Sequence, residues 1–600
     1  MKSTGSSVLW PLIVGAAIVL SGAPAVPASA AAAAPPTVTT PTGIFPSQTF
    51  QGVANSGAND FLGIRFAAAP VGSLRFAAPA APAAVSGTVN ATSFGSPCPQ
   101  NASPFGTAST REDCLFLNVY VPGSSISSGN KLPVMVFFFG GDFVDGEGSL
   151  YDPTNMATQG NAIVVTINYR LGILGYMASA ALSSQASTGV SGNYGFLDQL
   201  FALQWVKQNI GAFGGNPDNV TIFGESAGGF SVCAAIASPK GAGLFQRAIT
   251  ESGPCAEPLP TLATAQTSGA SIVSALGCAE SSDAATVACL RNLPVSAILT
   301  EQNTITSAAN LTSLTAFFTN VDGVFIPQQP VLALALGEFN HVPVIEGTNH
   351  DEGRLFVALG FDLNPAVGTI TAAGYPTAIQ SVASALVTAE AGLLTTSGSA
   401  SLATGGSTSS SSSSGNSQEE NQIAQEILHE YPLANFTGPG EALGAVLTDG
   451  LFSCIANVTN EVLSLSVPTF AYEFNDENAP TPELPPVSFP YGATHTDELP
   501  FLFTLPGTPS TLSNAEQTLA TQMKSYWTRF AQGGNPNSSQ TPAWAPFSVA
   551  TGNVQSLNTP RPGVEFNYAA EHHCNFWIGI LEQTILASVA ATLTSDGIVE

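Results

Sequence analysis

The chain has few basic residues and few charged residues of any kind. Its 600 residues include 14 Lys and Arg against 41 Asp and Glu, so its formal net charge is −27 at neutral pH. Nucleic acid and anionic membrane surfaces are themselves negatively charged, and we do not expect either as a partner. Because 44% of the residues are hydrophobic, the low charge does not indicate disorder, and the length allows a large buried core.

Long hydrophobic runs are also absent beyond the N-terminus. The apolar stretch Val8 to Leu20 is shorter than the ~20 residues of a membrane-spanning helix. It follows the basic Lys2 and precedes Ala28-Ser29-Ala30, a small-x-small cleavage pattern. The sequence therefore predicts a signal peptide over residues 1–30, a secreted protein and no stable membrane anchor. An uncleaved N-terminal anchor is the alternative interpretation.

Histidine is scarce, with six residues in the chain. None of them belongs to a His-Glu-x-x-His pattern, so a metal hydrolase is not predicted. His572 and His573 precede Cys574, and we interpret them as a surface pair beside a disulfide. No metal site and no cofactor is predicted.

Eight cysteines are present, which is typical of a protein from an oxidising compartment. Possible N-glycosylation sites of the Asn-x-Ser/Thr type agree with export. They are Asn90, Asn101, Asn219, Asn310, Asn435, Asn457 and Asn537. Asn219 is the least expected to carry a glycan, because it opens a strand that we predict to be buried.

The motif Gly224-Glu225-Ser226-Ala227-Gly228 is the most informative feature present. A Gly-x-Ser-x-Gly pattern alone is weak evidence in a chain rich in Gly and Ser. Here it follows the strand-like run Val220 to Ile222 and precedes the helix-like run Phe230 to Ser238. A serine at such a strand-to-helix turn is a nucleophile elbow, in which the turn is too tight for side chains at the two glycine positions. The context predicts that Ser226 is the nucleophile of a serine hydrolase.

Apolar segments alternate with helical patterns along most of the chain. The predicted strands are Val134 to Phe139, Ile163 to Ile167, Arg247 to Thr250, Val342 to Ile345 and Thr469 to Phe474, and residues 196–210 have helical spacing. This alternation predicts an α/β fold with a large, mostly parallel central sheet and helices on both faces. We predict one domain over residues 31–600, with a loose segment at 31–48 and a disordered Ser/Gly-rich insertion near 397–417.

A serine nucleophile needs a base and an acid, which follow it in the order Ser, acid, His in sheet-based hydrolases. Elimination among the histidines leaves His495, which follows a predicted strand and a Pro-rich loop. A surface histidine is the alternative interpretation. Asp351 and Glu352 both lie after the strand at 342–345, and spacing alone does not choose between them.

Hydrogen-bond donors for a developing oxyanion are expected at two places. One is the N–H of Ala227, the residue after the nucleophile. The other is the Gly-rich loop Phe139-Gly140-Gly141-Asp142-Phe143 after the strand at 134–139. An ordinary tight turn is the alternative interpretation of that loop.

Taken in order, these motifs and several others resemble the type-B carboxylesterase/lipase family, the cholinesterase-like branch of the α/β-hydrolases. The resemblance covers residues from about 50 to about 580 and is highly specific because the motifs occur in order. The further segments that carry it are Phe61 to Ile64, Pro70 to Phe76, Glu112 to Val119, Asn193 to Val206 and Phe213 to Pro217.

The resemblance implies a carboxylic-ester hydrolase with the α/β-hydrolase fold. It places the catalytic groups at Ser226, Glu352 and His495, and the oxyanion donors at Gly141, Asp142 and Ala227. The chain departs from the family pattern at Asp142, where a glycine is usual, because a carboxylate aimed at an oxyanion would repel it. The backbone N–H of Asp142 can still donate if the side chain turns away.

Three disulfides are also implied by the resemblance. They join Cys98 to Cys114, Cys278 to Cys289 and Cys454 to Cys574. Cys233 and Cys255 are left over, and we favour an unpaired Cys233 at a buried helix position over a fourth bridge.

The family's first disulfide loop carries the lid of its lipases and the choline-binding Trp of its cholinesterases. Here 15 residues separate Cys98 from Cys114, with one Phe and no Trp. We therefore expect a hydrolase of small or medium esters, acting on a small-molecule ester substrate. The alternatives are a lipase or sterol esterase for long-chain esters and, from another class, an inactive adhesion module of the same fold. The sequence predicts no oligomeric state.

Overall fold

A large twisted sheet forms the centre of the computed structural model, which describes residues 35–55, 57–123, 126, 129–306, 316–394, 413–481, 484–505 and 512–580. Within these residues the sheet has 11 strands in the order β14-β13-β12-β11-β10-β9-β7-β8-β6-β4-β3. The strands are β3 (Val53–Asn55), β4 (Ala58–Arg65), β6 (Phe116–Pro122), β7 (Leu132–Phe138), β8 (Ile163–Ile167), β9 (Gly215–Glu225), β10 (Arg247–Glu251), β11 (Val344–Asn349), β12 (Thr469–Phe474), β13 (Val554–Leu557) and β14 (Gly563–Glu565).

The centre of this sheet is parallel, and its edges are antiparallel. Parallel pairing runs from β8 through β7, β9, β10, β11 and β12 to β13. Each residue of β8, β11 and β12 is buried, which is expected of strands covered on both faces. The register sets Glu225 of β9 opposite Glu251 of β10, so the carboxyl ends of neighbouring strands meet at one edge. The predicted mostly parallel α/β sheet is confirmed.

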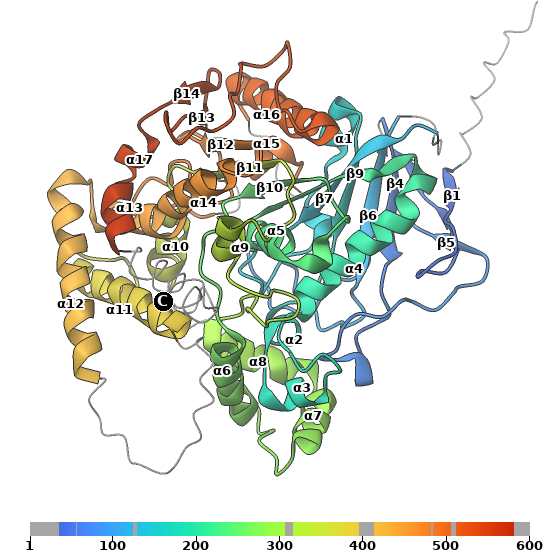
Figure 1. Ribbon diagram of the computed structural model, residues 1–600, viewed down its shortest axis with the longest axis horizontal. Helices are drawn as coiled ribbons and strands as arrows, with labels where there is room; N and C mark the ends of the chain where they lie inside the picture. Colours follow the sequence, from blue (N-terminus) through green and yellow to red (C-terminus); the bar gives the residue numbers. More distant parts are fainter. Residues whose placement is uncertain are drawn as a thin grey trace, which may run out of the picture. The chain divides into compact units, whose positions relative to one another are not determined.

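Helices cover both faces of the sheet. Helix α5 (Ala227–Ala237) packs on β7, β9 and β10, with α4 (Tyr194–Asn209) beside it. Helices α1 (Thr154–Gly160) and α16 (Asn514–Gly533) pack against each other and lie on the other side of the sheet (Figure 1). The remaining helices that border the sheet or its loops are α2 (Gly172–Tyr176), α3 (Ala180–Gln185), α6 (Leu262–Ala275), α7 (Asp283–Asn292), α8 (Val295–Thr306), α9 (Pro330–Leu336), α10 (Gly353–Val357), α15 (Leu499–Leu502) and α17 (Tyr568–Glu571).

A second apolar core lies among helices inserted after β11. Its helices are α11 (Tyr375–Leu394), α12 (Ser413–Glu430), α13 (Pro439–Thr448) and α14 (Cys454–Ser464), around side chains such as Ile379, Ile427, Val446 and Ile455. The helical run Pro439–Ser464 is long and apolar enough to cross a membrane, but 83% of its most apolar stretch is buried inside the protein. We therefore read it as a core element.

Two organisational predictions need correction. The segment 31–48 is not loose throughout, because β1 (Thr37–Thr39) pairs with β2 (Thr49–Gln51), which also pairs with β5 (Thr88–Asn90) in a separate three-stranded sheet. The predicted insertion at 397–417 is too long, because helix α12 begins at Ser413. Residues 397–412 and the predicted signal peptide lie outside the described residues.

Candidate active site

Ser226 occupies the sharp turn between β9 and α5. Its backbone has φ 56° and ψ −123°, outside the regions that L-residues prefer. A Cβ on Gly228 would lie 1.9 Å from the carbonyl oxygen of Phe138, and one on Gly224 would lie 2.5 Å from the carbonyl oxygen of Gly228. The two glycines are therefore sterically required, because the turn is too tight for a side chain at either position, as the sequence predicted.

Glu352, and not Asp351, is the acid that reaches His495. Oε2 of Glu352 lies 2.5 Å from Nδ1 of His495, and its Oε1 accepts a hydrogen bond from the N–H of Asn349. Asp351 instead pairs with Arg354 at 2.8 Å and accepts the N–H of Ala493 at 3.0 Å. The geometry thus separates two acids that spacing alone left equivalent.

The loop that carries His495 is tied to the carboxyl end of β11. Nδ2 of Asn349 donates to the carbonyl oxygen of Thr494 at 2.8 Å and to Oε2 of Glu498 at 2.6 Å. The rings of Phe356 and Phe452 lie 5.0 and 5.3 Å from the imidazole, centroid to centroid. These contacts hold the ring between a polar network and an apolar wall.

His495 also contacts a second carboxylate. Nε2 of His495 lies 3.1 Å from Oε1 of Glu225, while Oγ of Ser226 has no hydrogen bond within the described residues. Burial lowers the pKa of His495, but Glu352 and Glu225 more than offset this and raise the pKa to about 9. Burial raises the pKa of Glu225 to about 8. The sequence motif contained Glu225, but only its neighbourhood shows that it reaches the imidazole.

The loop after β7 lines the same cavity as the serine, through Gly141 and Asp142. Gly141, Asp142 and Phe143 have φ values of 107°, 52° and 57°, an unusual run of positive values. Among the described residues, the N–H groups of Gly141 and Asp142 donate to no carbonyl oxygen. Burial raises the pKa of Asp142 well above its ordinary value, with Asp145 adding to the effect, which favours a neutral side chain. This direction of the pKa shift reduces the repulsion that a carboxylate at this position would exert on an oxyanion.

A cavity of about 690 Å³ opens beside these groups. Ser226, His495, Gly141, Asp142 and Ala227 all line it. Much of the remaining wall is apolar and includes Phe230, Phe318, Leu355, Phe356, Phe452 and Ile455. This size and lining are typical of a small-molecule site.

One acid in the cavity wall has no obvious role from the sequence. Glu257 lines the cavity, and its Oε2 atom is buried without a hydrogen-bond partner among the described residues. Burial raises the pKa of Glu257 to about 8. A neutral carboxyl group in a largely apolar wall can hydrogen-bond a polar substituent of a ligand.

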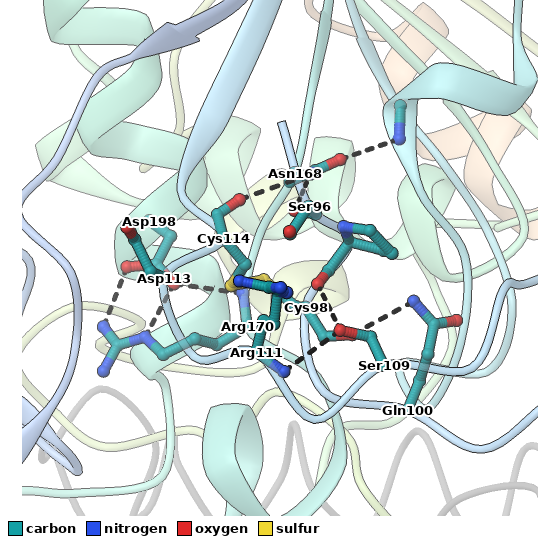
Figure 2. Close-up of a disulfide and its surroundings, with 12 residues drawn as sticks. Ser96, Cys98, Gln100, Ser109, Arg111, Asp113, Cys114, Asn168, Arg170 and Asp198 are labelled. Atoms are coloured by element: carbon teal, nitrogen blue, oxygen red, sulfur yellow. Dashed lines mark hydrogen bonds and ion pairs between the residues drawn. A yellow bond between two sulfur atoms is a disulfide. The ribbon is translucent and has the colours of Figure 1, made fainter. Parts of the chain in front are cut away.

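The disulfide between Cys98 and Cys114 closes a short loop that is anchored near the cavity (Figure 2). Nδ2 of Asn168 donates to the carbonyl oxygens of Ser96 and Cys114 at 3.1 and 3.2 Å. The side chain of Gln100 exchanges two hydrogen bonds with the backbone of Gly146, at 2.8 and 3.0 Å. Pro104 and Phe105 of this loop reach the cavity, so the loop borders the site but is too short for a large lid.

The structure contains the other two implied disulfides and one that was not favoured. Cys278 pairs with Cys289 and Cys454 pairs with Cys574, as the resemblance implied. Cys233 of α5 also pairs with Cys255, with a Cα–Cα distance of 5.0 Å. The prediction of an unpaired Cys233 is wrong because the loop after β10 folds back onto α5, which the sequence does not show.

The interpretation of His572 as a surface residue is also wrong. His572 is 3% exposed, and its two ring nitrogens lie 2.6 Å from Oδ1 of Asp449 and from Oε1 of Glu473. His573 is the half-exposed member of the pair and contacts Glu430. His572, Asp449 and Glu473 therefore form a buried polar cluster, and none of the three lines the cavity.

Comparison with known proteins agrees with this geometry. The sequence profile of the "Carboxylesterase family" matches residues 34–577. The chain belongs to the carboxylesterase family. Its resemblance to that family, the α/β-hydrolase fold and carboxylic-ester hydrolysis are thereby confirmed.

Relatives are similar over most of their length. Human "Cocaine esterase" is 32% identical over 550 residues, which cover 89% of each chain. "Para-nitrobenzyl esterase" of Bacillus subtilis (strain 168) is 33% identical over 519 residues, or 84% of this chain and 91% of the relative. A solved structure of a PNB esterase matches with a TM-score of 0.69 and 30% identity, covering 90% of this chain and 99% of that one.

Proposed function

We propose that this protein is a secreted serine carboxylic-ester hydrolase that works through Ser226, His495 and Glu352. The observation that carries the proposal is the shared cavity: the elbow serine and the imidazole line it together, and the imidazole is held from behind by a buried carboxylate. A serine hydroxyl, a base and an orienting acid are the parts that acyl transfer requires.

In the first half of the reaction, Oγ of Ser226 attacks the carbonyl carbon of the ester. Its proton passes to Nε2 of His495, and Glu352 stabilises the imidazolium through Nδ1. For this transfer, Nε2 has to exchange its contact with Glu225 for one with Ser226. Hydrogen bonds of a catalytic site are often loose before substrate binds, so the 3.1 Å contact with Glu225 is compatible with this role.

The tetrahedral intermediate carries a negative charge on the former carbonyl oxygen. The N–H groups of Gly141, Asp142 and Ala227 are the proposed donors, each worth roughly 3–4 kcal/mol to the transition state. Collapse of the intermediate releases the alcohol with the proton from His495. A water molecule, deprotonated by the same imidazole, then attacks the acyl-serine and frees the acid.

Small and medium esters are the proposed substrates. The volume of about 690 Å³ lies within the usual range of small-molecule sites, and the first disulfide loop has no room for a lipase lid. A second candidate is the hydrolysis of long-chain esters. It is favoured by the apolar wall that continues to Val382 and Leu386 of α11 and to Leu451.

Secretion is proposed on two independent grounds. Four disulfides are typical of an oxidising compartment. The basic, apolar and small-residue segments of residues 1–30 have the order of a signal peptide. We expect the protein to be released into the medium. N-terminal sequencing of the released protein should show cleavage near Ala30.

The test is a series of nitrophenyl esters from acetate to palmitate, with wild type beside Ser226→Ala. We expect the highest kcat/KM on short or medium chains and a loss of about 10⁶-fold in kcat in the variant, because Ser226 is the nucleophile. Highest activity on long chains would replace the first substrate proposal with the second.

Ser274→Ala serves as the matched control, because Ser274 is an exposed serine of α6. It should keep wild-type kinetics. Retention of full activity by Ser226→Ala, with a circular dichroism spectrum like that of wild type, would refute the proposed nucleophile.

A further inference from the structure

A cluster of metal-ligating side chains lies outside the cavity. His350 follows β11, Glu473 belongs to β12, and His572 follows α17. One ligand atom from each lies within 4.8 Å of the other two. Two imidazoles and a carboxylate are ligands that divalent transition metals prefer.

The imidazole of His572 is oriented by a carboxylate on its far side. Oδ1 of Asp449 lies 2.6 Å from Nδ1, which leaves Nε2 directed at Oε1 of Glu473, also at 2.6 Å. Asp449 is itself held by the hydroxyl of Tyr431, which donates to its Oδ2 at 2.7 Å. A carboxylate behind a histidine is the usual outer partner of a metal-binding imidazole.

The other two side chains also have outer partners. Nδ2 of Asn475 donates to Oε2 of Glu473 at 3.3 Å, which leaves Oε1 facing His572. Oδ1 of Asp351 lies 3.3 Å from Nδ1 of His350. His572 and Glu473 therefore each have one atom directed inward and another hydrogen-bonded outside the cluster, whereas Nδ1 of His350 makes the ion-pair contact with Asp351 without a hydrogen bond.

A further carboxylate, Glu571, lies at the exposed side of the cluster, outside the group of three whose ligand atoms lie within 4.8 Å of one another. Oε1 of Glu571 lies 3.5 Å from Nε2 of His350, and its other oxygen accepts a hydrogen bond from Asn567 at 2.8 Å. The side chains of His350 and Glu571 are 22% and 42% exposed, which leaves them room to turn, and Glu571 has to move toward the other three to complete the set.

We propose that His350, Glu473, His572 and Glu571 bind one zinc ion. Zinc suits a four-coordinate set of two imidazoles and two carboxylates, with bonds of about 2.0–2.2 Å. Four protein ligands leave no open position for substrate, so the site is structural. Within the described residues, none of these four side chains lines the cavity with Ser226.

Such an ion would join three segments that are distant in sequence. It would tie the ends of β11 and β12 to the segment after α17, next to the disulfide between Cys454 and Cys574. Because a zinc ion that binds only the folded state stabilises it by mass action, the expected effect is a higher Tm.

The test begins with protein stripped by a chelator and dialysed at about pH 8, where protons compete less for imidazole. Calorimetric titration with Zn²⁺ should give one equivalent bound, and Tm should rise by roughly 2 °C or more. His350→Gln should weaken zinc binding by about 10-fold or more. Glu571→Gln, at an exposed position, provides a second variant if His350→Gln does not fold.

His341→Gln is the matched control, because His341 is an exposed histidine stacked on Phe339 and outside the cluster. It should bind zinc as wild type does. The proposal is wrong if wild type binds no zinc saturably, if His350→Gln and Glu571→Gln both bind it like wild type, or if His341→Gln alone abolishes binding. In each of these cases the cluster is a network of carboxylates and protonated histidines only.

Discussion

His495 lies between two buried carboxylates, and this position governs the proton that the proposed reaction has to move. Glu352 approaches Nδ1 and Glu225 approaches Nε2. Only Glu352 has the place of the orienting acid, because Nε2 is the nitrogen that faces the serine in the proposed mechanism. Glu225 therefore modifies the base without replacing the acid.

This arrangement predicts an alkaline rise in activity. Since the pKa of His495 is raised to about 9, the neutral imidazole needed as a base forms as pH increases toward that value. Glu225→Gln removes one of the raising charges, so the rise in kcat/KM should move to lower pH. The measurement is the pH dependence of kcat/KM on nitrophenyl acetate for both proteins.

Glu280→Gln, at an exposed position, is the control and should leave the profile unchanged. A profile for Glu225→Gln that coincides with that of wild type would show that Glu225 does not influence the imidazole. A uniform loss of activity at every pH would point to a structural role only.

At the scale of elements, helix α5 is fixed at its first residue and near its middle. Its first residue follows Ser226 in the elbow, and Cys233 at the end of its second turn is bonded to Cys255 in the loop after β10. The N–H of Ser226 also donates to the carbonyl oxygen of Glu251, the last residue of β10. The nucleophile is therefore held to the neighbouring strand both directly and through the disulfide.

Removal of this bridge should destabilise the protein and disturb the site. The double variant Cys233→Ala/Cys255→Ala is expected to lose roughly 3 kcal/mol of unfolding free energy, from the entropy of the opened loop. A lower Tm and a lower kcat should accompany the loss. Cys278→Ala/Cys289→Ala, on the bridge at α7, should lower Tm but leave kcat unchanged.

A simple count of thiols checks the pairing itself. Wild-type protein, denatured without a reductant, should contain no thiol that reacts with a thiol reagent, because all eight cysteines are paired. About two reactive thiols per chain would contradict the fourth bridge and restore the unpaired Cys233.

At the scale of the whole molecule, several carboxyl groups have raised pKa values because they are buried. Burial raises the pKa of Glu225 and of Glu257 to about 8, and that of Glu498 to about 7, from an ordinary value of 4.5. Between the ordinary pKa of 4.5 and these raised pKa values, the three carboxyl groups are protonated in the folded protein but ionised in the unfolded chain. The free energy of unfolding therefore falls as pH rises through this window.

We expect Tm to be higher at about pH 5 than at about pH 9. His495 acts in the same direction, since its raised pKa makes the folded state bind more protons than the unfolded state up to about pH 9. Scanning fluorimetry in chelator at constant ionic strength is the measurement. Added salt screens repulsion among surface charges but affects the buried groups much less, so the trend should persist in salt. A Tm that is constant or rises with pH would contradict this account.

Local patterns were sufficient for much of the fold. The apolar strand Thr469 to Phe474 has the same bounds in the sequence analysis and in the structure, and the helix expected at 196–210 is α4. The elbow was also predictable, because its two glycines are a local steric requirement that stands in the sequence. Element boundaries were less accurate where strands continue beyond their apolar run, as β9 does from Gly215 to Glu225.

What the sequence alone determined is the type of chemistry and the sheet on which it is built, because both depend on residues close together in the chain. Residue spacing left two acids open and the family resemblance implied Glu352, which the structure places at His495. Only the tertiary structure decided that Glu225 reaches the other nitrogen of the same ring, that Cys233 pairs with Cys255, and that His572 is buried. Each of these depends on the distance and direction between side chains from separate loops. Sequence spacing carries no information on those quantities until the strands that bear the loops are assembled.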